Sequence, residues 1–112
     1  MQTPKLIELS CRSLIRPQLP SDVKDCELLF TAKIGMDASQ GDNFRFSVVT
    51  PAALTRSQYT GWGKDQLILQ EFSWALVDNC LDNLLSSVRG DSWAEVAGQL
   101  HEFMDWELYS HR

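Results

Sequence analysis

The sequence predicts one α+β domain spanning residues 1–112. Its expected architecture is a two-layer sandwich, an antiparallel β-sheet of four to five strands with two main helices packed on one face. Apolar and polar side chains alternate in several segments of the first half, which is typical of strands with one exposed face. Residues 73–104 instead carry apolar side chains at intervals of three and four, as amphipathic helices do. The length of 112 residues and the hydrophobic share of 44% suit one core of modest size.

The expected order of elements is β-β-β-(short α)-β-α-α-β. The first three strands are expected over residues 6–14, 27–36 and 44–50, where the alternation is clear. Turn-forming residues between the second and third strands predict a hairpin. Two prolines predict a loop between the first and second strands.

Thr50 and Pro51 predict the start of a short helix after the third strand. Threonine is a favourable N-cap, and proline is favoured at the first helical position. This helix should end near Gln58. After a loop, residues 66–72 are expected to form the fourth strand.

Two longer helices are expected from residue 73 onward. Ser73 is a suitable N-cap for the main helix, whose apolar stripe continues to Val88, and Gly90 suits the position just past its end. Residues 92–95, Ser-Trp-Ala-Glu, have the pattern of a capping box and begin the second helix. Residues 106–109 alternate and should return to the sheet as an edge strand. The expected stripe of the second helix is Trp93, Val96, Ala97, Leu100, Phe103 and Met104.

Charge is distributed unevenly along the chain. The formal net charge is −5, and nine of the 15 acidic residues lie from Asp65 onward, together with only two basic residues. An acidic surface repels phosphate groups, so neither nucleic acid nor an anionic membrane is expected as a partner. A small domain with an acidic half is instead suited to binding something basic.

The expected location is the cytoplasm. The first residues lead directly into a strand pattern and lack the apolar region of a signal peptide. The longest apolar runs are far shorter than the roughly 20 residues that span a bilayer. Three cysteines, which are odd in number and widely spaced, favour reduced and mostly buried thiols over disulfides.

No residue pattern predicts catalysis, a metal or a cofactor. The three cysteines and two histidines lack the spacing of zinc ligands. Neither a cysteine nor a serine lies in a recognisable nucleophile motif. The segment Gly61-Trp-Gly63 lacks the length and the ending of a phosphate-binding loop. The chain is therefore expected not to be an enzyme.

Four acidic residues are candidates for contact with a basic partner. Asp78 and Asp82 lie one turn apart on the expected exposed face of the main helix. Glu95 and Glu102 lie on the expected exposed face of the second helix. The alternative for each pair is a solvated helix surface without a partner.

Two aromatic residues in the loop before the fourth strand are further candidates. Tyr59 and Trp62 are flanked by glycine and polar residues, and exposed aromatic side chains on loops are frequent anchors of interfaces. The alternative is that Trp62 folds back onto the edge of the sheet.

Four stretches form an ordered set in the second half of the chain, namely Thr50-Pro51, Leu67-Ile-Leu-Gln-Glu-Phe-Ser-Trp74, Gly90-Asp-Ser-Trp-Ala-Glu-Val-Ala97, and Trp106-Glu107 followed by Tyr109. With this set the chain resembles the immunity protein 8 family of bacterial polymorphic toxin and contact-dependent growth inhibition systems. The resemblance covers about half of the chain. The chain departs from the family at Ser73, where the family has an acidic residue, and at residues 108–111, where the family's ending is more acidic.

The resemblance implies a small cytoplasmic protein that binds and neutralises a cognate toxin domain, one-to-one and without turnover. The expected partner is the C-terminal toxin domain of a secreted or surface effector, a basic nuclease such as a tRNase. An acidic inhibitor steers association with a basic cleft and can occlude it. The expected toxin-binding residues are Asp78, Asp82, Glu95, Glu102, Tyr59 and Trp62.

Two other functions remain open from the sequence. A chaperone or adaptor for a basic secreted effector would bind its partner without blocking activity. An enzyme that uses acidic side chains, with or without a metal, would need carboxylates that converge in a concave site.

Overall fold

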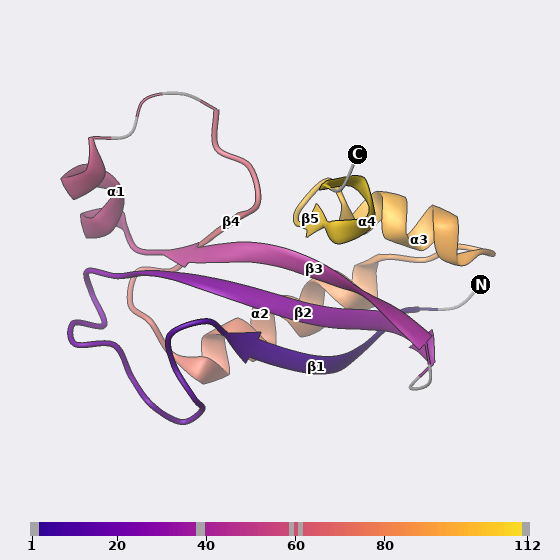
Figure 1. Cartoon of the computed structure of the whole chain (residues 1–112), viewed down its shortest axis with the longest axis horizontal. Coiled ribbons are helices and arrows are strands. Elements are labelled where there is room, and N and C mark those ends of the chain that lie inside the picture. The colour runs from indigo at the N-terminus through magenta and orange to yellow at the C-terminus, as the bar shows by residue number, and fades with distance from the viewer. Residues whose placement is uncertain (1–2, 38–39, 59, 61, 111–112) are drawn as a thin grey trace.

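The computed structural model describes residues 3–37, 40–58, 60 and 62–110. The α+β class is confirmed, and the expected elements follow one another in the expected order with one short helix added at the end. Figure 1 shows the long strands side by side, with α2 behind them and α3 beyond β3. The elements are β1 (Lys5–Cys11), β2 (Glu27–Asp37), β3 (Gln40–Val49), α1 (Pro51–Ser57), β4 (Gln66–Ile68), α2 (Trp74–Ser87), α3 (Trp93–Leu100), β5 (Asp105–Trp106) and α4 (Glu107–Ser110).

The five strands form one sheet in the order β1-β2-β3-β4, and β5 also pairs with β3. The β1–β2, β2–β3 and β3–β5 ladders are antiparallel, as expected. The short strand β4 differs, because it runs parallel to β3 with Ser47 opposite Gln66. Residues 50–65 contain α1 and provide the crossover of a dozen or more residues that a parallel pair requires.

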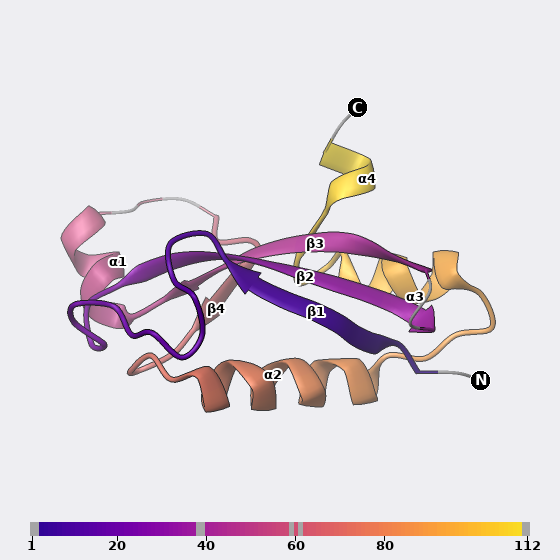
Figure 2. The same ribbon diagram turned by 60° about the horizontal axis from the view of Figure 1, so that its bottom comes forward.

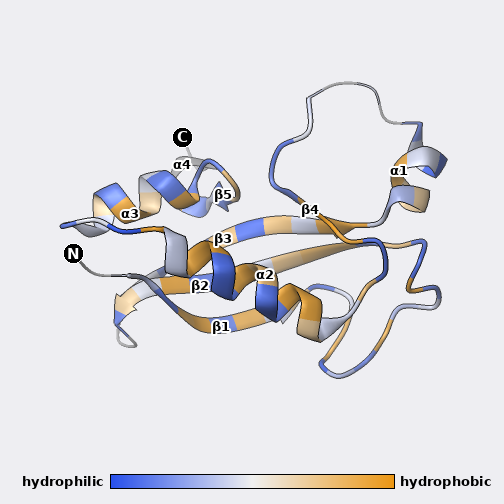
Figure 3. Cartoon of the chain, turned by 180° about the vertical axis from the view of Figure 1, so that it is seen from behind, coloured by the Kyte–Doolittle hydropathy of each residue, from blue (hydrophilic) through white to orange (hydrophobic). Residues whose placement is uncertain are grey.

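The core lies between one face of the sheet and the helices α2 and α3. Alternate residues of β2 and β3, among them Phe30, Phe44 and Val48, are fully buried. Side chains of both helices belong to the same hydrophobic cluster, so the expected packing of two main helices on one face is confirmed. Figure 2 shows α2 beneath the sheet, and Figure 3 shows hydrophobic residues on the strands that it covers.

The expected C-terminal edge strand over residues 106–109 is wrong. Only Asp105 and Trp106 pair with β3, and Glu107–Ser110 forms α4. An alternation over four residues cannot distinguish a strand from a single helical turn. Figure 2 shows α4 on the side of the sheet opposite α2.

Both main helices end earlier than the apolar spacing suggests. Helix α3 ends at Leu100, and the turns that follow leave Phe103 54% exposed rather than in the buried stripe. Helix α2 ends at Ser87 with an extended C-cap, so Gly90 is not the residue just past its end. A Cβ atom on Gly90 would lie 2.9 Å from Cβ of Glu95. Glycine at this position therefore permits the close approach of α3.

The indole N–H groups of Trp74, Trp93 and Trp106 donate hydrogen bonds that hold these side chains in place. Trp93 and Trp106 both donate to Oδ2 of Asp42, at 2.9 and 3.0 Å. Trp74 donates to the carbonyl oxygen of Gln18 at 2.7 Å. Asp42 therefore joins the start of β3 to α3 and to β5. The tryptophans of the Gly90–Ala97 and Trp106-Glu107 stretches consequently have a structural role.

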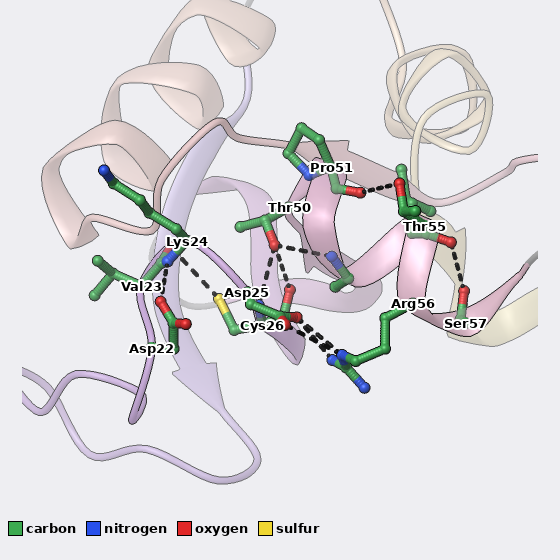
Figure 4. Close-up of polar contacts among 12 residues, drawn as sticks. Asp22, Val23, Lys24, Asp25, Cys26, Thr50, Pro51, Thr55, Arg56 and Ser57 are labelled. Carbon is green, nitrogen blue, oxygen red and sulfur yellow. Dashed lines mark hydrogen bonds and ion pairs between the residues drawn. The ribbon is translucent and has the colours of Figure 1, made fainter.

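The side chain of Thr50 connects the start of β2 to α1 (Figure 4). It is fully buried, and its Oγ1 accepts a hydrogen bond from the backbone N–H of Cys26 at 3.0 Å. Oγ1 also accepts from the N–H of Ala53 at 3.4 Å, which confirms the expected N-cap. Nearby, the guanidinium of Arg56 donates to both carboxylate oxygens of Asp25.

Replacing Thr50 with valine is expected to lower the free energy of unfolding by about 1–3 kcal/mol. Valine preserves the shape of the side chain but leaves the N–H groups of Cys26 and Ala53 without their acceptor. The matched variant Thr50→Ser retains the hydroxyl and should lose less stability. Urea denaturation of the two variants measures the difference, and equal losses would show that the hydroxyl is not the stabilising group.

Candidate functional site

The described residues do not group into a metal site. None of them form a set of three or more His, Cys, Asp or Glu side chains that could hold an ion. Cys11, Cys26 and Cys80 are free thiols, and burial together with the charges of Asp22 and Asp25 raises the pKa of the Cys26 thiol. A raised pKa keeps that thiol protonated and unreactive. Among the described residues, no helix has the length and apolar composition needed to span a membrane.

Several acidic residues in the second half form ion pairs with basic residues of the first half. Asp78 pairs with Arg16 at 2.5 Å. Asp105 pairs with Arg45 and Asp65 with Lys64, each at 2.9 Å. The two oppositely charged halves of the sequence therefore neutralise each other in part when the chain folds.

Five other acidic residues of the second half remain exposed. Within the described ranges, none of the five lies within ion-pairing distance of a basic group. They account for the local excess of negative charge on the helical side and its loops. The five are Glu71, Asp82, Asp91, Glu95 and Glu102.

Asp78 and Asp82 lie on α2 at the flank nearest the loop that follows β1. The guanidinium of Arg16 donates to both carboxylate oxygens of Asp78 and also lies 5.3 Å from the centre of the Trp74 ring. The hydrogen bond to Asp78 is the main cause that raises the pKa of Arg16. Asp78 is thus half-buried and paired, whereas Asp82, one turn further along α2, is exposed.

Glu102 and Trp62 belong to a different edge of the molecule. Glu102 lies in the turn after α3 and lines a depression of about 240 Å³ together with Ile68 and Phe103. The loop that ends at β4 carries Trp62, which is 96% exposed, so it does not fold back onto the edge of the sheet. Tyr59 in the same loop lies outside the described residues.

The candidate residues are therefore distributed over two edges of the sheet. Asp78 and Asp82 lie toward the β1 edge, whereas Trp62 and Glu102 lie toward the β4 edge. Glu95 is exposed in the first turn of α3. Adjacent strands are about 4.8 Å apart, so the two edges of a four-strand sheet are separated by only about 15 Å.

Sequence reasoning missed two exposed apolar residues beside Glu102. Ile68 and Phe103 are each 54% exposed and line the same depression. The sequence predicts a strand position for Ile68 and a buried position for Phe103, because three-residue spacing places Phe103 on the same stripe as Leu100. Helix α3 ends at Leu100, however, and the turn that follows leaves Phe103 exposed.

A family model described as Immunity protein 8 matches residues 6–110 of the chain. No curated protein and no solved structure matches it.

Proposed function

This chain belongs to the immunity protein 8 family, and we propose that it binds and neutralises one cognate toxin domain by stoichiometric occlusion. The family match over residues 6–110 carries this proposal, because the family implies an immunity protein of a polymorphic toxin system. Inhibition of this kind consumes no substrate. Each toxin molecule is blocked by one immunity protein for as long as the complex lasts.

The proposed partner is the C-terminal toxin domain of a secreted or surface effector, and its proposed activity is that of a basic nuclease such as a tRNase. The effector would belong to a contact-dependent growth inhibition system or another polymorphic toxin system, and the two proteins would meet in the cytoplasm. The net charge of −5 and the five exposed acidic residues support a basic partner. Opposite charges accelerate association and select against other acidic proteins.

The proposed contact residues lie toward two edges of the sheet, and a single interface can cover both. A typical interface buries about 800 Å² on each partner, which is a patch about 30 Å across. The two edges of the sheet, about 15 Å apart, fit within that width. The contact residues are Asp78, Asp82, Glu95 and Glu102 on the helical side, with Tyr59 and Trp62 as aromatic anchors.

Titration of the toxin domain's activity with this protein tests the proposed function. The toxin domain encoded next to this chain is expected to lose its activity completely at one molar equivalent, because the complex is one-to-one. Full activity in a demonstrated complex would instead support a chaperone or adaptor. No complex and no inhibition would count against immunity toward that toxin.

A further inference from the structure

Three depressions of the surface meet at Gln66, the first residue of β4. One lies on the open face of the sheet and contains Arg45, Ser47 and Asp105. The second, of about 70 Å³, is lined mostly by apolar side chains, which come from α2, from Leu67 of β4 and from Phe46, Phe103 and Met104. The third, of about 240 Å³, is formed by Gly63, Lys64, Asp65, Gln66, Ile68, Glu102 and Phe103, and we name it the β4 notch.

The notch exists because two short strands share one edge of β3. Strand β4 pairs with residues 47–49 of β3, and β5 pairs with Phe44 and Arg45. Phe46 lies between these two ladders and lines two of the three depressions. The turn after α3 and the loop before β4 therefore face each other across a break in the sheet edge (Figure 1).

The side chains of the β4 notch combine apolar surface with one unpaired acid. Ile68 and Phe103 are each 54% exposed, although both are large and hydrophobic. Lys64 and Asp65 neutralise each other at 2.9 Å, which leaves Glu102 as the excess charge. An apolar wall beside a single carboxylate complements a side chain that has an apolar stem and a cationic head.

From these observations we infer that the β4 notch receives an arginine or lysine side chain of the toxin domain. The carboxylate of Glu102 binds the cationic head, and Phe103 and Ile68 pack along the stem. Phe103 can also place its ring face against the cation. This inference rests on the proposed function and adds to it the chemistry and position of one anchor.

Affinity measurements on the complex with the co-purified toxin domain test the inference. Glu102→Lys is expected to raise Kd by about 30-fold or more, and Phe103→Ala by about 10- to 30-fold, as anchor residues do. Both side chains are exposed, so the thermal midpoint of the free protein should change little. In a double-mutant cycle with Glu102→Gln and Phe103→Ala, the losses should be less than additive, because both residues hold the same side chain.

Two matched controls show whether an effect depends on the β4 notch or only on the type of substitution. Glu8→Lys makes the same change of charge on the open face of the sheet, where Glu8 is exposed opposite Lys33, a residue that alternates with the buried Ala32 and Ile34. Leu108→Ala removes a residue that is 58% exposed on α4, which lies on the side of the sheet opposite α2 (Figure 2). Both should leave Kd within about threefold of the wild-type value.

The outcomes distinguish this inference from the proposed function. If the wild-type protein binds and both Glu102→Lys and Phe103→Ala leave Kd unchanged, this inference is overturned and the proposed function stands. A loss with Glu8→Lys as large as with Glu102→Lys also overturns it, because net charge would then explain the effect. A wild-type protein that does not bind or inhibit the toxin domain overturns both.

Discussion

Replacing Asp42 with alanine is expected to lower the free energy of unfolding by about 2–6 kcal/mol. The carboxylate oxygen Oδ2 accepts the indole N–H of Trp93 and that of Trp106, and both rings are largely buried against Phe44. Alanine leaves two partly buried donors without an acceptor, and each such loss costs about 1–3 kcal/mol. Urea denaturation measures the loss.

Two further variants identify the cause of that loss. Asp42→Asn keeps an acceptor oxygen and removes only the charge, so it should be intermediate between wild type and Asp42→Ala. Glu71→Ala removes an exposed carboxylate and should change stability by less than about 0.5 kcal/mol. If Asp42→Ala were as stable as Glu71→Ala, the two indole hydrogen bonds would not be holding α3 and β5 to the sheet.

Reversing two charges on α2 is the second large effect, and it concerns binding rather than folding. The double variant Asp78→Lys with Asp82→Lys is expected to weaken toxin binding by about 10- to 100-fold, because it places two like charges against a basic partner. The association rate should fall more than the dissociation rate rises, and the difference should shrink at high salt. Surface-based kinetic measurements at two salt concentrations report both rates.

The control for this variant is provided by the ion pair between Arg16 and Asp78. Arg16→Ala breaks the same pair without reversing an acidic residue, so it should leave the association rate unchanged or slightly higher. If Arg16→Ala weakened binding as much as the double variant, the loss of affinity would come from the loop after β1 rather than from the reversed charges. If the double variant bound as tightly as the wild type, Asp78 and Asp82 would not belong to the contact surface.

Most of the fold could be predicted from two local patterns, the alternation of apolar and polar residues in strands and the three- and four-residue spacing of apolar residues in helices. The alternation of Phe44, Phe46 and Val48 with polar residues in β3, and capping residues such as Ser73 and Ser92, are local signals that remain valid after folding. Strand β4 has only three residues, and its parallel direction depends on the path of the crossover rather than on its own sequence. No local pattern distinguishes a parallel partner from an antiparallel one over that length.

The candidate site was less predictable, because it depends on contacts between distant residues. Asp78 looked exposed from its helical position, but Arg16, 62 residues earlier, pairs with it. Phe103 looked buried from its spacing, but the end of α3 at Leu100 turns it outward. For Trp62 the sequence left two alternatives open, an exposed side chain and one that packs on the edge of the sheet, and its 96% exposed side chain decides between them.

Co-expression with the toxin domain encoded immediately upstream tests the central claim most directly. The measurement is survival of the cells together with co-purification of the two proteins. Immunity predicts that cells survive only when this chain is present and that a stable one-to-one complex is recovered. Death of cells that contain soluble, folded protein would contradict immunity toward that toxin.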